Sequence, residues 1–178
     1  MRRLKQAADR FFETVHVEGG PTTRAVIKRP SDNDQPGVEF ASPRLTARVM
    51  LNSLLKSGDV IRVADAERYL LADHSSTPEY RTHHMFPCDR QVPWTRKVEV
   101  IDPVTKLKKS DGQPVLIGNI WVMWERTRRE FMDLSIRVAQ ESALVDTGAD
   151  VKLGDLVAGM KVKRVNEALG IRILELMA

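Results

Sequence analysis

Cysteine is almost missing from this chain of 178 residues, which contains only Cys88. No intrachain disulfide framework can form, and the composition fits a reducing compartment. Aromatic residues make up only 6%, and Trp94, Trp121 and Trp124 are scattered along the sequence. Single-strand nucleic-acid binding uses several stacking aromatics on one sheet face. The formal net charge of +4 is too small to indicate a nucleic-acid partner by itself.

Long hydrophobic runs are missing as well. The most apolar stretch, Val115 to Trp124, is short and contains Asn119, so no membrane span is expected. The basic N-terminus is followed by Gln6 and Asp9 instead of an apolar region, so no secretory signal peptide is expected. Glycine-rich phosphate loops, Gly-x-Ser-x-Gly and His-Glu-x-x-His are also missing. With 42% hydrophobic and 29% charged residues, the chain can bury one core, or one core plus an accessory lobe.

The sequence from Val38 to Leu71 has strand patterns on both sides of a Gly58-Asp59 turn. A strand, a tight turn and a returning strand predict a small antiparallel barrel unit. Residues 44–55 allow two interpretations. Ser42-Pro43 resembles the start of a helix, whereas Leu45, Ala47, Val49 and Leu51 alternate as in a strand. We predict a strand over 44–51.

The rest of the chain is divided by its periodicity and its turn residues. Helical spacing of apolar residues predicts an amphipathic helix over about 2–15, and residues 22–29 are β-rich. Residues 73–94 are polar and interrupted by prolines, and their His- and Cys-containing part, 74–89, is interpreted as a solvated or interface loop. Strands over 95–101 and 115–124 predict a projecting hairpin. We therefore predict a mainly β fold with small antiparallel β-barrels, organised as an N-terminal helix (1–20), a barrel core (21–94), a β-arm (95–130) and C-terminal hairpins (131–178) that complete the barrel or form a second one.

A second Gly-Asp pair occurs near the C-terminus, in Lys152-Leu153-Gly154-Asp155-Leu156-Val157. Like Lys56-Ser57-Gly58-Asp59-Val60-Ile61, it follows a lysine by two positions and leads into an apolar strand. Two such units are too few, and their returning segments too different in length, to indicate a duplication.

Three segments of the first barrel unit carry a family resemblance: Phe40 to Arg48, Gly58 to Ile61, and Arg68 to Leu71. Together they resemble the barrel core of the head-tail joining (head-closure or stopper) proteins of tailed bacteriophages. The resemblance covers roughly 35 residues and implies a barrel that acts by assembly. It implies a ring-shaped homo-oligomer in the neck of a virion, assembled in the host cytoplasm. The implied partners are a portal or adaptor protein and a tail protein, with possible non-specific contact to packaged DNA and none to a membrane.

Asp146-Thr147-Gly148 resembles the active-site loop of retroviral-type aspartic proteases. The resemblance implies that Asp146 shares a proton with its twin from a second subunit or lobe. However, only 178 − 146 = 32 residues follow, too few for the flap and the later glycine loop of that fold. Asp-x-Gly is also ordinary turn chemistry. We therefore predict that Asp146 is a turn residue.

A histidine-rich stretch offers candidate metal ligands. Zinc needs about four nitrogen or sulfur ligands, and His84-x3-Cys88 supplies two. No second cysteine is present, and neighbouring His83 and His84 point to opposite faces of an extended chain. Asp89 places an acid, not a base, beside the Cys88 thiol, which argues against a nucleophile. We predict no metal, cofactor or catalytic site among His74, His83, His84, Cys88 and Asp89.

Basic residues form a third candidate site, since phosphate contact needs only positive charge within reach. We interpret them as a solvated face. They are Arg90, Arg96, Lys97, Lys106, Lys108 and Lys109 near Trp94, and Lys161, Lys163 and Arg164 on the C-terminal hairpin.

The sequence thus predicts a non-enzymatic structural protein of the phage head-to-tail connector. Two alternatives stay open: an aspartic protease that uses Asp146, and a basic nucleic-acid-binding β-barrel module.

Overall fold

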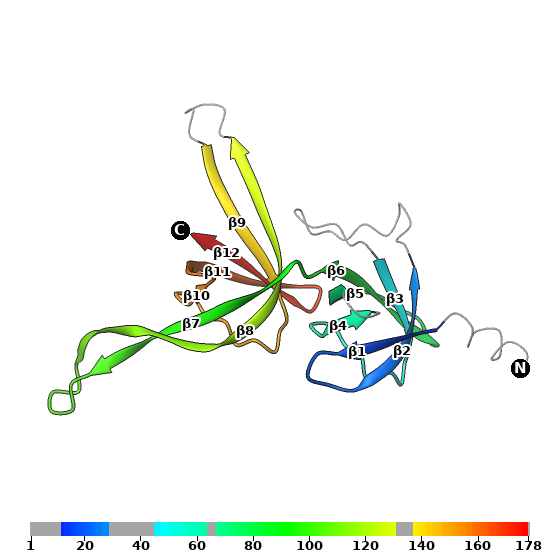
Figure 1. The fold of residues 1–178 in the computed structure, drawn as a ribbon, viewed down its shortest axis with the longest axis horizontal. Helices are drawn as coiled ribbons and strands as arrows, with labels where there is room; N and C mark the ends of the chain where they lie inside the picture. Colours follow the sequence, from blue (N-terminus) through cyan, green and yellow to red (C-terminus); the bar gives the residue numbers. More distant parts are fainter. Residues whose placement is uncertain (1–11, 29–44, 64–66, 131–136, 178) are drawn as a thin grey trace, which may run out of the picture.

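The computed structural model describes residues 12–28, 45–63, 67–130 and 137–177. These residues form two closed antiparallel β-barrels of six strands each (Figure 1). The prediction of a mainly β barrel protein is therefore confirmed. None of the described residues is helical, so no helix among them is long and apolar enough to cross a membrane.

The first barrel takes its strands from the first half of the chain. They are β1 (Glu13–Val17), β2 (Thr22–Lys28), β3 (Leu45–Met50), β4 (Val60–Val63), β5 (Glu67–Ser76) and β6 (Tyr80–Pro87). Their order around the barrel is β1-β2-β3-β6-β5-β4, and β4 closes onto β1. The predicted strand over 44–51 is confirmed as β3 for residues 45–50, whereas Leu51 lies in the turn that follows.

The second barrel follows the same path. Its strands are β7 (Arg90–Ile101), β8 (Lys108–Glu130), β9 (Arg137–Val145), β10 (Leu156–Val157), β11 (Met160–Ala168) and β12 (Ile171–Met177). The order is β7-β8-β9-β12-β11-β10, and β10 closes onto β7. Strand for strand, this is the topology of the first barrel. The chain therefore contains one barrel topology twice, which the short Gly-Asp motif was too brief to indicate.

The two Gly-Asp pairs occupy equivalent turns. Gly58 precedes β4 with φ of 87°, and Gly154 precedes β10 with φ of 88°, a left-handed conformation that glycine adopts without steric cost. In each turn the aspartate Oδ2 accepts the N–H of the lysine three residues earlier, at 3.0 Å from Lys56 and 2.8 Å from Lys152. The same local sequence therefore starts the same strand in both barrels.

Each barrel has its own apolar core, and a third cluster joins the two. Leu70, Ala72 and Phe86 on the outside of the first barrel pack with Val60 and with three residues of the second barrel: Leu144, Ile171 and Ile173. At this joint the Asp73 N–H donates to the Leu169 carbonyl at 2.7 Å. The Arg68 guanidinium lies over the Trp121 ring, 4.2 Å from its centroid. The barrels thus share a buried apolar contact with polar links at its edge.

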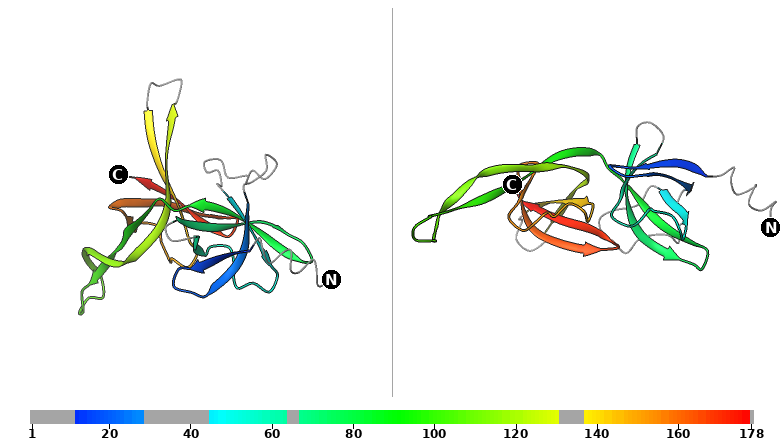
Figure 2. Two further views of the ribbon diagram at one scale, coloured as in Figure 1. Left: turned by 45° about the vertical axis from the view of Figure 1, so that its right-hand side comes forward. Right: turned by 90° about the horizontal axis from the view of Figure 1, so that it is seen from below.

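Two hairpins extend beyond the barrels. The outer parts of β7 and β8 form an arm that projects at one end of the molecule, and both further views show it clear of the barrels (Figures 1 and 2). The adjacent β8–β9 hairpin, with paired residues up to Glu130 and Arg137, projects in another direction. The arm corresponds by topology to the β1–β2 hairpin, which in the first barrel turns tightly at residues 18–21.

Several predictions are corrected by the structure. The N-terminal helix is wrong for residues 13–15, which belong to β1, where Val15 pairs with Thr23 and Val63; residues 1–11 lie outside the described residues. The segment 74–89 is not a loop, because most of its residues belong to β5 and β6. The segment 95–130 is not a separate arm, because the parts of β7 and β8 nearest the barrel are strands of the second barrel itself.

Candidate functional site

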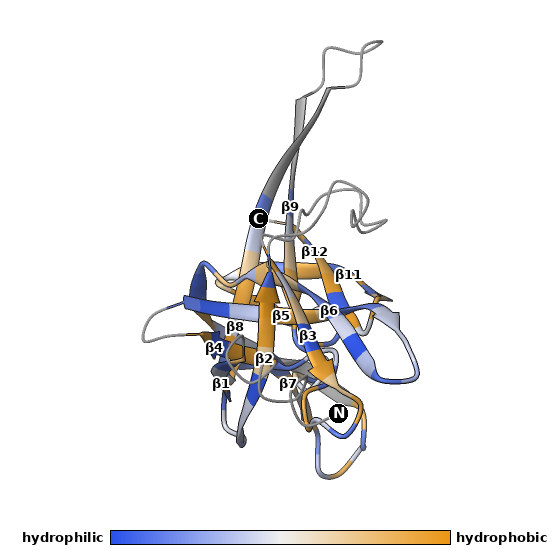
Figure 3. Ribbon diagram, turned by 90° about the vertical axis from the view of Figure 1, so that its right-hand side faces the viewer, coloured by the Kyte–Doolittle hydropathy of each residue, from blue (hydrophilic) through white to orange (hydrophobic). Residues whose placement is uncertain are grey.

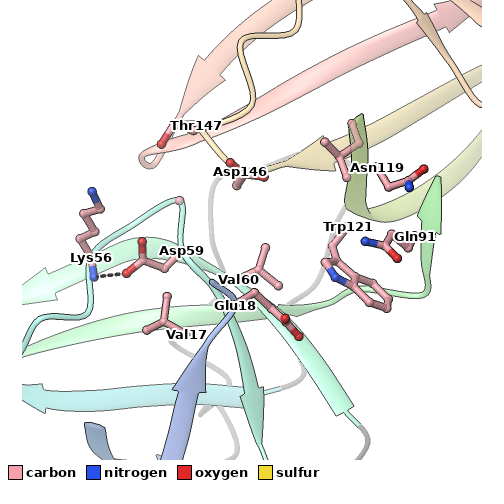
Figure 4. A pocket seen from close by; sticks show the side chains of 13 residues that line it. Val17, Glu18, Lys56, Asp59, Val60, Gln91, Asn119, Trp121, Asp146 and Thr147 are labelled. Atoms are coloured by element: carbon pink, nitrogen blue, oxygen red, sulfur yellow. Dashed lines mark hydrogen bonds between the residues drawn. The ribbon is translucent and has the colours of Figure 1, made fainter. Parts of the chain in front are cut away.

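A pocket of the described surface is lined by residues of both barrels. It has a volume of about 550 Å³ and is lined by the end of β1, the Gly58 turn, the inner parts of β7 and β8, and the Asp146 turn. Figure 4 shows its carboxylates, Glu18, Asp59 and Asp146, together with Lys56 and Trp121. Sequence analysis placed only Asp146 and Trp121 among the candidate residues. The other three became neighbours through barrel packing, which no local motif reveals.

The three carboxylates of this pocket already have partners within the fold. Glu18 accepts from the Arg68 guanidinium at 2.5 Å, and Asp59 accepts the Lys56 N–H. Asp146 Oδ1 accepts the Ala149 N–H at 2.8 Å. Carboxylates held in this way stabilise turns and strand ends. The pocket therefore has the bonding pattern of a joint between barrels.

Asp146 lies where the sequence placed a turn. It follows the last residue of β9, Val145, and its hydrogen bond to Ala149 is that of an aspartate turn. In an aspartic protease the carboxylate instead faces a second aspartate and a water. The arrangement at Asp146 favours the turn interpretation over the catalytic one.

Ser57, Asp73 and His83 form a cluster that sequence analysis did not anticipate. The Ser57 hydroxyl donates to Asp73, and His83 Nδ1 lies 3.3 Å from Ser57 Oγ and 4.0 Å from Asp73 Oδ1. In a hydrolase triad, serine and aspartate approach opposite nitrogens of the imidazole. Here both approach Nδ1, so the triad geometry is not present. The cluster instead packs against Gly170 of the second barrel.

Burial dominates the electrostatics of His83, whose side chain is 2% exposed. Desolvation lowers the pKa of His83, since burial disfavours the charged imidazolium. Asp73 opposes this effect, and Arg81 adds to it. Among the described residues, Nε2 of His83 has no hydrogen-bond partner. His83 is therefore a neutral buried histidine near physiological pH.

The other residues of the histidine-rich stretch do not form a metal site with it. His84 lies in β6 and stacks with His74, their ring centroids 4.3 Å apart. Cys88 is half-buried at the joint, where burial, with help from Asp89, raises its pKa to about 12. Such a thiol is a poor nucleophile. Within the described ranges, no three His, Cys, Asp or Glu side chains are grouped so that they could hold a metal ion.

A buried polar network fixes the base of the arm. Asp155 Oδ2 accepts from Trp94 Nε1 at 2.8 Å, and both oxygens accept from Arg96, at 2.8 and 2.9 Å. Arg96 also donates to the Asp150 carbonyl. Burial raises the pKa of Asp155, but the hydrogen bonds from Arg96, Lys152 and Trp94 outweigh it, so the net shift is downward. Sequence analysis assigned Arg96 to a solvated basic face; it is instead a partly exposed cation paired with the buried Asp155.

The remaining basic candidates do not gather at one place. Arg90 lies over the Trp124 ring at 5.4 Å, and Arg164 pairs with Glu175 at 3.2 Å. Lys161 and Lys163 are exposed on β11. Lys97 and Lys106 are exposed on the arm, and the side chains of Lys108 and Lys109 lie outside those that the structure describes. Some of these cations are thus paired within the fold, and the exposed lysines lie on two separate surfaces, β11 and the arm.

Comparison of the chain with protein-family models, curated proteins and solved structures finds no match.

Proposed function

We propose that this protein is a virion structural protein of a tailed bacteriophage. In this proposal it forms part of the head-to-tail connector, where it assembles into a homo-oligomeric ring and docks to a portal-side and a tail-side protein. The proposal combines the resemblance of residues 40–71 with the architecture. Its main support is the arm, a long β-hairpin with exposed apolar side chains that extends from two joined barrels.

The barrels explain why an arm is needed. A closed barrel pairs all of its strand edges, so it offers little backbone to a neighbour. Contacts between subunits must then come from side chains and from hairpins that leave the barrel. The polar clusters around Asp155 and around His83 stabilise the barrels and the contact between them. This also favours a structural role over a catalytic one.

The proposal is tested by the mass of the protein in solution and in its particle. Native mass spectrometry of the purified full chain at rising concentration should give a defined multimer, and imaging of the assembled particle should give the same number of copies in a ring. A strict monomer in both settings overturns the proposal.

A deletion variant isolates the role of the arm. Residues 102–113 are removed and the two strands are joined by a short turn. The far-ultraviolet circular dichroism and the tryptophan emission should stay as in the intact chain, because residues 102–107, 112 and 113 are not buried, whereas the multimer should weaken. An arm-deleted chain that still assembles fully would show that the ring forms through other surfaces.

A further inference from the structure

Cations gather on the outer face of the first barrel. One residue set in β1–β4 is buried in the core and marks the inward side of these strands: Val15, Ala25, Ala47 and Ile61. Their neighbours in each strand therefore point outward. The outward residues include four cations: Arg24 and Lys28 of β2, Arg48 of β3 and Arg62 of β4. No aspartate or glutamate points outward from the described residues of these four strands.

The strand register places the four cations along one diagonal line. His16 of β1 pairs with Arg62 on one side and with the first residue of β2 on the other, so Arg62 is level with the start of β2. Arg24 is the next outward position of β2. Arg48 is level with the outward position after that, and Lys28 comes last. With about 3.4 Å per residue and about 4.8 Å between strands, successive cations are roughly 8–12 Å apart and the line is roughly 20 Å long.

These side chains are available to a partner. Arg24, Lys28 and Arg48 are exposed, and Arg62 is half-buried. Within the described ranges, Lys28, Arg48 and Arg62 have no carboxylate partner. Arg48 lies over the Tyr80 ring, 4.2 Å from its centroid, and an arginine that stacks on a ring can still donate its N–H groups.

Other arginines of the described structure are instead neutralised within the fold. Four of them pair with carboxylates: Arg68 with Glu18, Arg96 with Asp155, Arg164 with Glu175 and Arg172 with Glu167. The cation line also lies away from the joint, because β2 and β3 contribute no residue to the cluster that links the barrels. Figure 3 views the molecule from this side, with β2 and β3 in front. The line is therefore an open, uncompensated positive surface.

The form of this surface indicates a linear polyanion. A line of separate charges matches a chain of phosphates better than it matches a flat anionic membrane, and phosphate contact needs only positive charge within reach. An acidic peptide could not add to the sheet as a strand, because β2 is already paired on both edges, with β1 and β3.

The same surface favours a duplex over a single strand. Single-strand binding uses aromatic rings on which bases stack, whereas the ring of Tyr80 on this face is covered by Arg48. A duplex stacks its own bases and presents one phosphate about every 3.4 Å along each strand. A line of roughly 20 Å therefore meets several phosphates of one strand, enough for each of its four cations.

We propose that the outer face of β1–β4 binds the phosphate backbone of a nucleic-acid duplex, without reading its sequence, through Arg24, Lys28, Arg48 and Arg62. This inference goes beyond the proposed function, and its outcome does not depend on whether the chain forms a ring.

The salt dependence of binding tests the proposal. Fluorescence anisotropy follows a fluorescein-labelled DNA duplex of random sequence as the full chain is added at several salt concentrations. Four phosphate contacts should give a slope of about −3 to −4 for the logarithm of the binding constant against the logarithm of the salt concentration. The double variant Lys28→Gln/Arg48→Gln should bind at least about tenfold more weakly at ~0.1 M salt, with a slope shallower by about 2.

Two control variants separate the position of the charges from their number and from folding. Lys161→Gln/Lys163→Gln removes the same charge from exposed lysines of β11 and should bind as the intact chain does. Lys28→Arg/Arg48→Lys keeps both charges on the proposed face and should also bind as the intact chain does, since backbone contact requires charge alone.

Several outcomes would overturn the inference. The first is no binding of the duplex at low salt. The second is an equal loss of binding in Lys28→Gln/Arg48→Gln and in Lys161→Gln/Lys163→Gln, which would show that only the net charge matters. The third concerns the class of partner: polyglutamate, phosphatidylserine vesicles or single-stranded oligothymidylate that binds more tightly than the duplex, and loses this binding in Lys28→Gln/Arg48→Gln, would assign the face to that partner instead.

Discussion

Asp155→Asn should destabilise the protein far more than Asp59→Asn, although the two aspartates hold the same position in equivalent turns. Asp59 accepts one backbone hydrogen bond, from Lys56 at 3.0 Å. Asp155 is 3% exposed and accepts from Trp94, from Arg96 twice, and from the Lys152 N–H. The pair therefore separates the turn, which both positions share, from the buried charge network, which only the second barrel has.

The magnitude follows from these contacts. Removing one partner of a buried ion pair costs about 3–5 kcal/mol. The Arg96 side chain is 28% exposed and regains some hydration, so we expect the lower end, about 3 kcal/mol. Asp59→Asn keeps an oxygen for the turn and should cost less than about 1 kcal/mol.

Urea unfolding followed by far-ultraviolet circular dichroism, to which the strands of both barrels contribute, measures both variants. All three tryptophans of the chain lie in β7 and β8, so their fluorescence reports separately on the second barrel. With a slope of about 2–3 kcal/mol per molar, Asp155→Asn should lower the midpoint by roughly 1–1.5 M. Equal shifts for the two variants would refute the argument that the network, and not the turn, supplies the stability.

The pH dependence gives an independent check on Asp155. Its folded pKa is lowered by its hydrogen bonds, so its stabilisation is fully present above the unfolded pKa of about 3.9. The stability difference between the intact chain and Asp155→Asn should stay constant from neutral pH to about pH 5. It should then shrink as the pH falls through the lowered folded pKa. A difference that persists at the lowest pH at which the chain stays folded would point to packing instead of charge.

Three further predictions concern the joint and the Asp146 turn. Gly154→Ala should cost about 1–2 kcal/mol through its left-handed φ, whereas Gly58→Ala should cost clearly more by urea unfolding, since its methyl group would also overlap Thr147 Oγ1; equal losses would contradict the packed joint. Because burial lowers the pKa of His83, acidification from pH 6.5 should reduce stability by up to about 1.4 kcal/mol per pH unit, and this slope should vanish in His83→Gln. Asp146→Asn should assemble as the intact chain does, while acid-dependent peptide cleavage that disappears in this variant would restore the protease alternative.

Strand periodicity predicted much of the barrel from sequence. Residues 44–51, 95–101 and 115–124 were predicted as strands, and β3, β7 and β8 contain the described ones except Leu51, because alternation reports which side chains face a core. The loop prediction for 74–89 failed because its strands are held by pairing with residues distant in sequence, and three of its polar residues, Thr82, His83 and His84, are buried. His83 is paired with Ala47 and Asp73 across β3 and β5. No local pattern distinguishes such a histidine from one in a loop.

The N-terminal segment failed for a related reason. Helical spacing that included Val15 predicted a helix, but residues 13–17 are rich in β-branched side chains, and pairing with β2 and β4 determines their conformation. The candidate site was less predictable still. Asp155 was visible as half of a repeated Gly-Asp pair, whereas its partners Trp94 and Arg96 lie about 60 residues away, and only barrel closure brings them together.

The correspondence between the arm and the tight β1–β2 turn has a consequence for how such chains can diverge. Both are the first hairpin of the same topology, yet one ends at the barrel rim and the other continues outward. Each two residues added to both strands of a hairpin move its tip by about 6.8 Å. Neither core changes, since the added residues lie outside both. The reach of the hairpin is thus a trait separate from folding stability, and scaffolds of different span can arise from one barrel topology through insertions at a single hairpin.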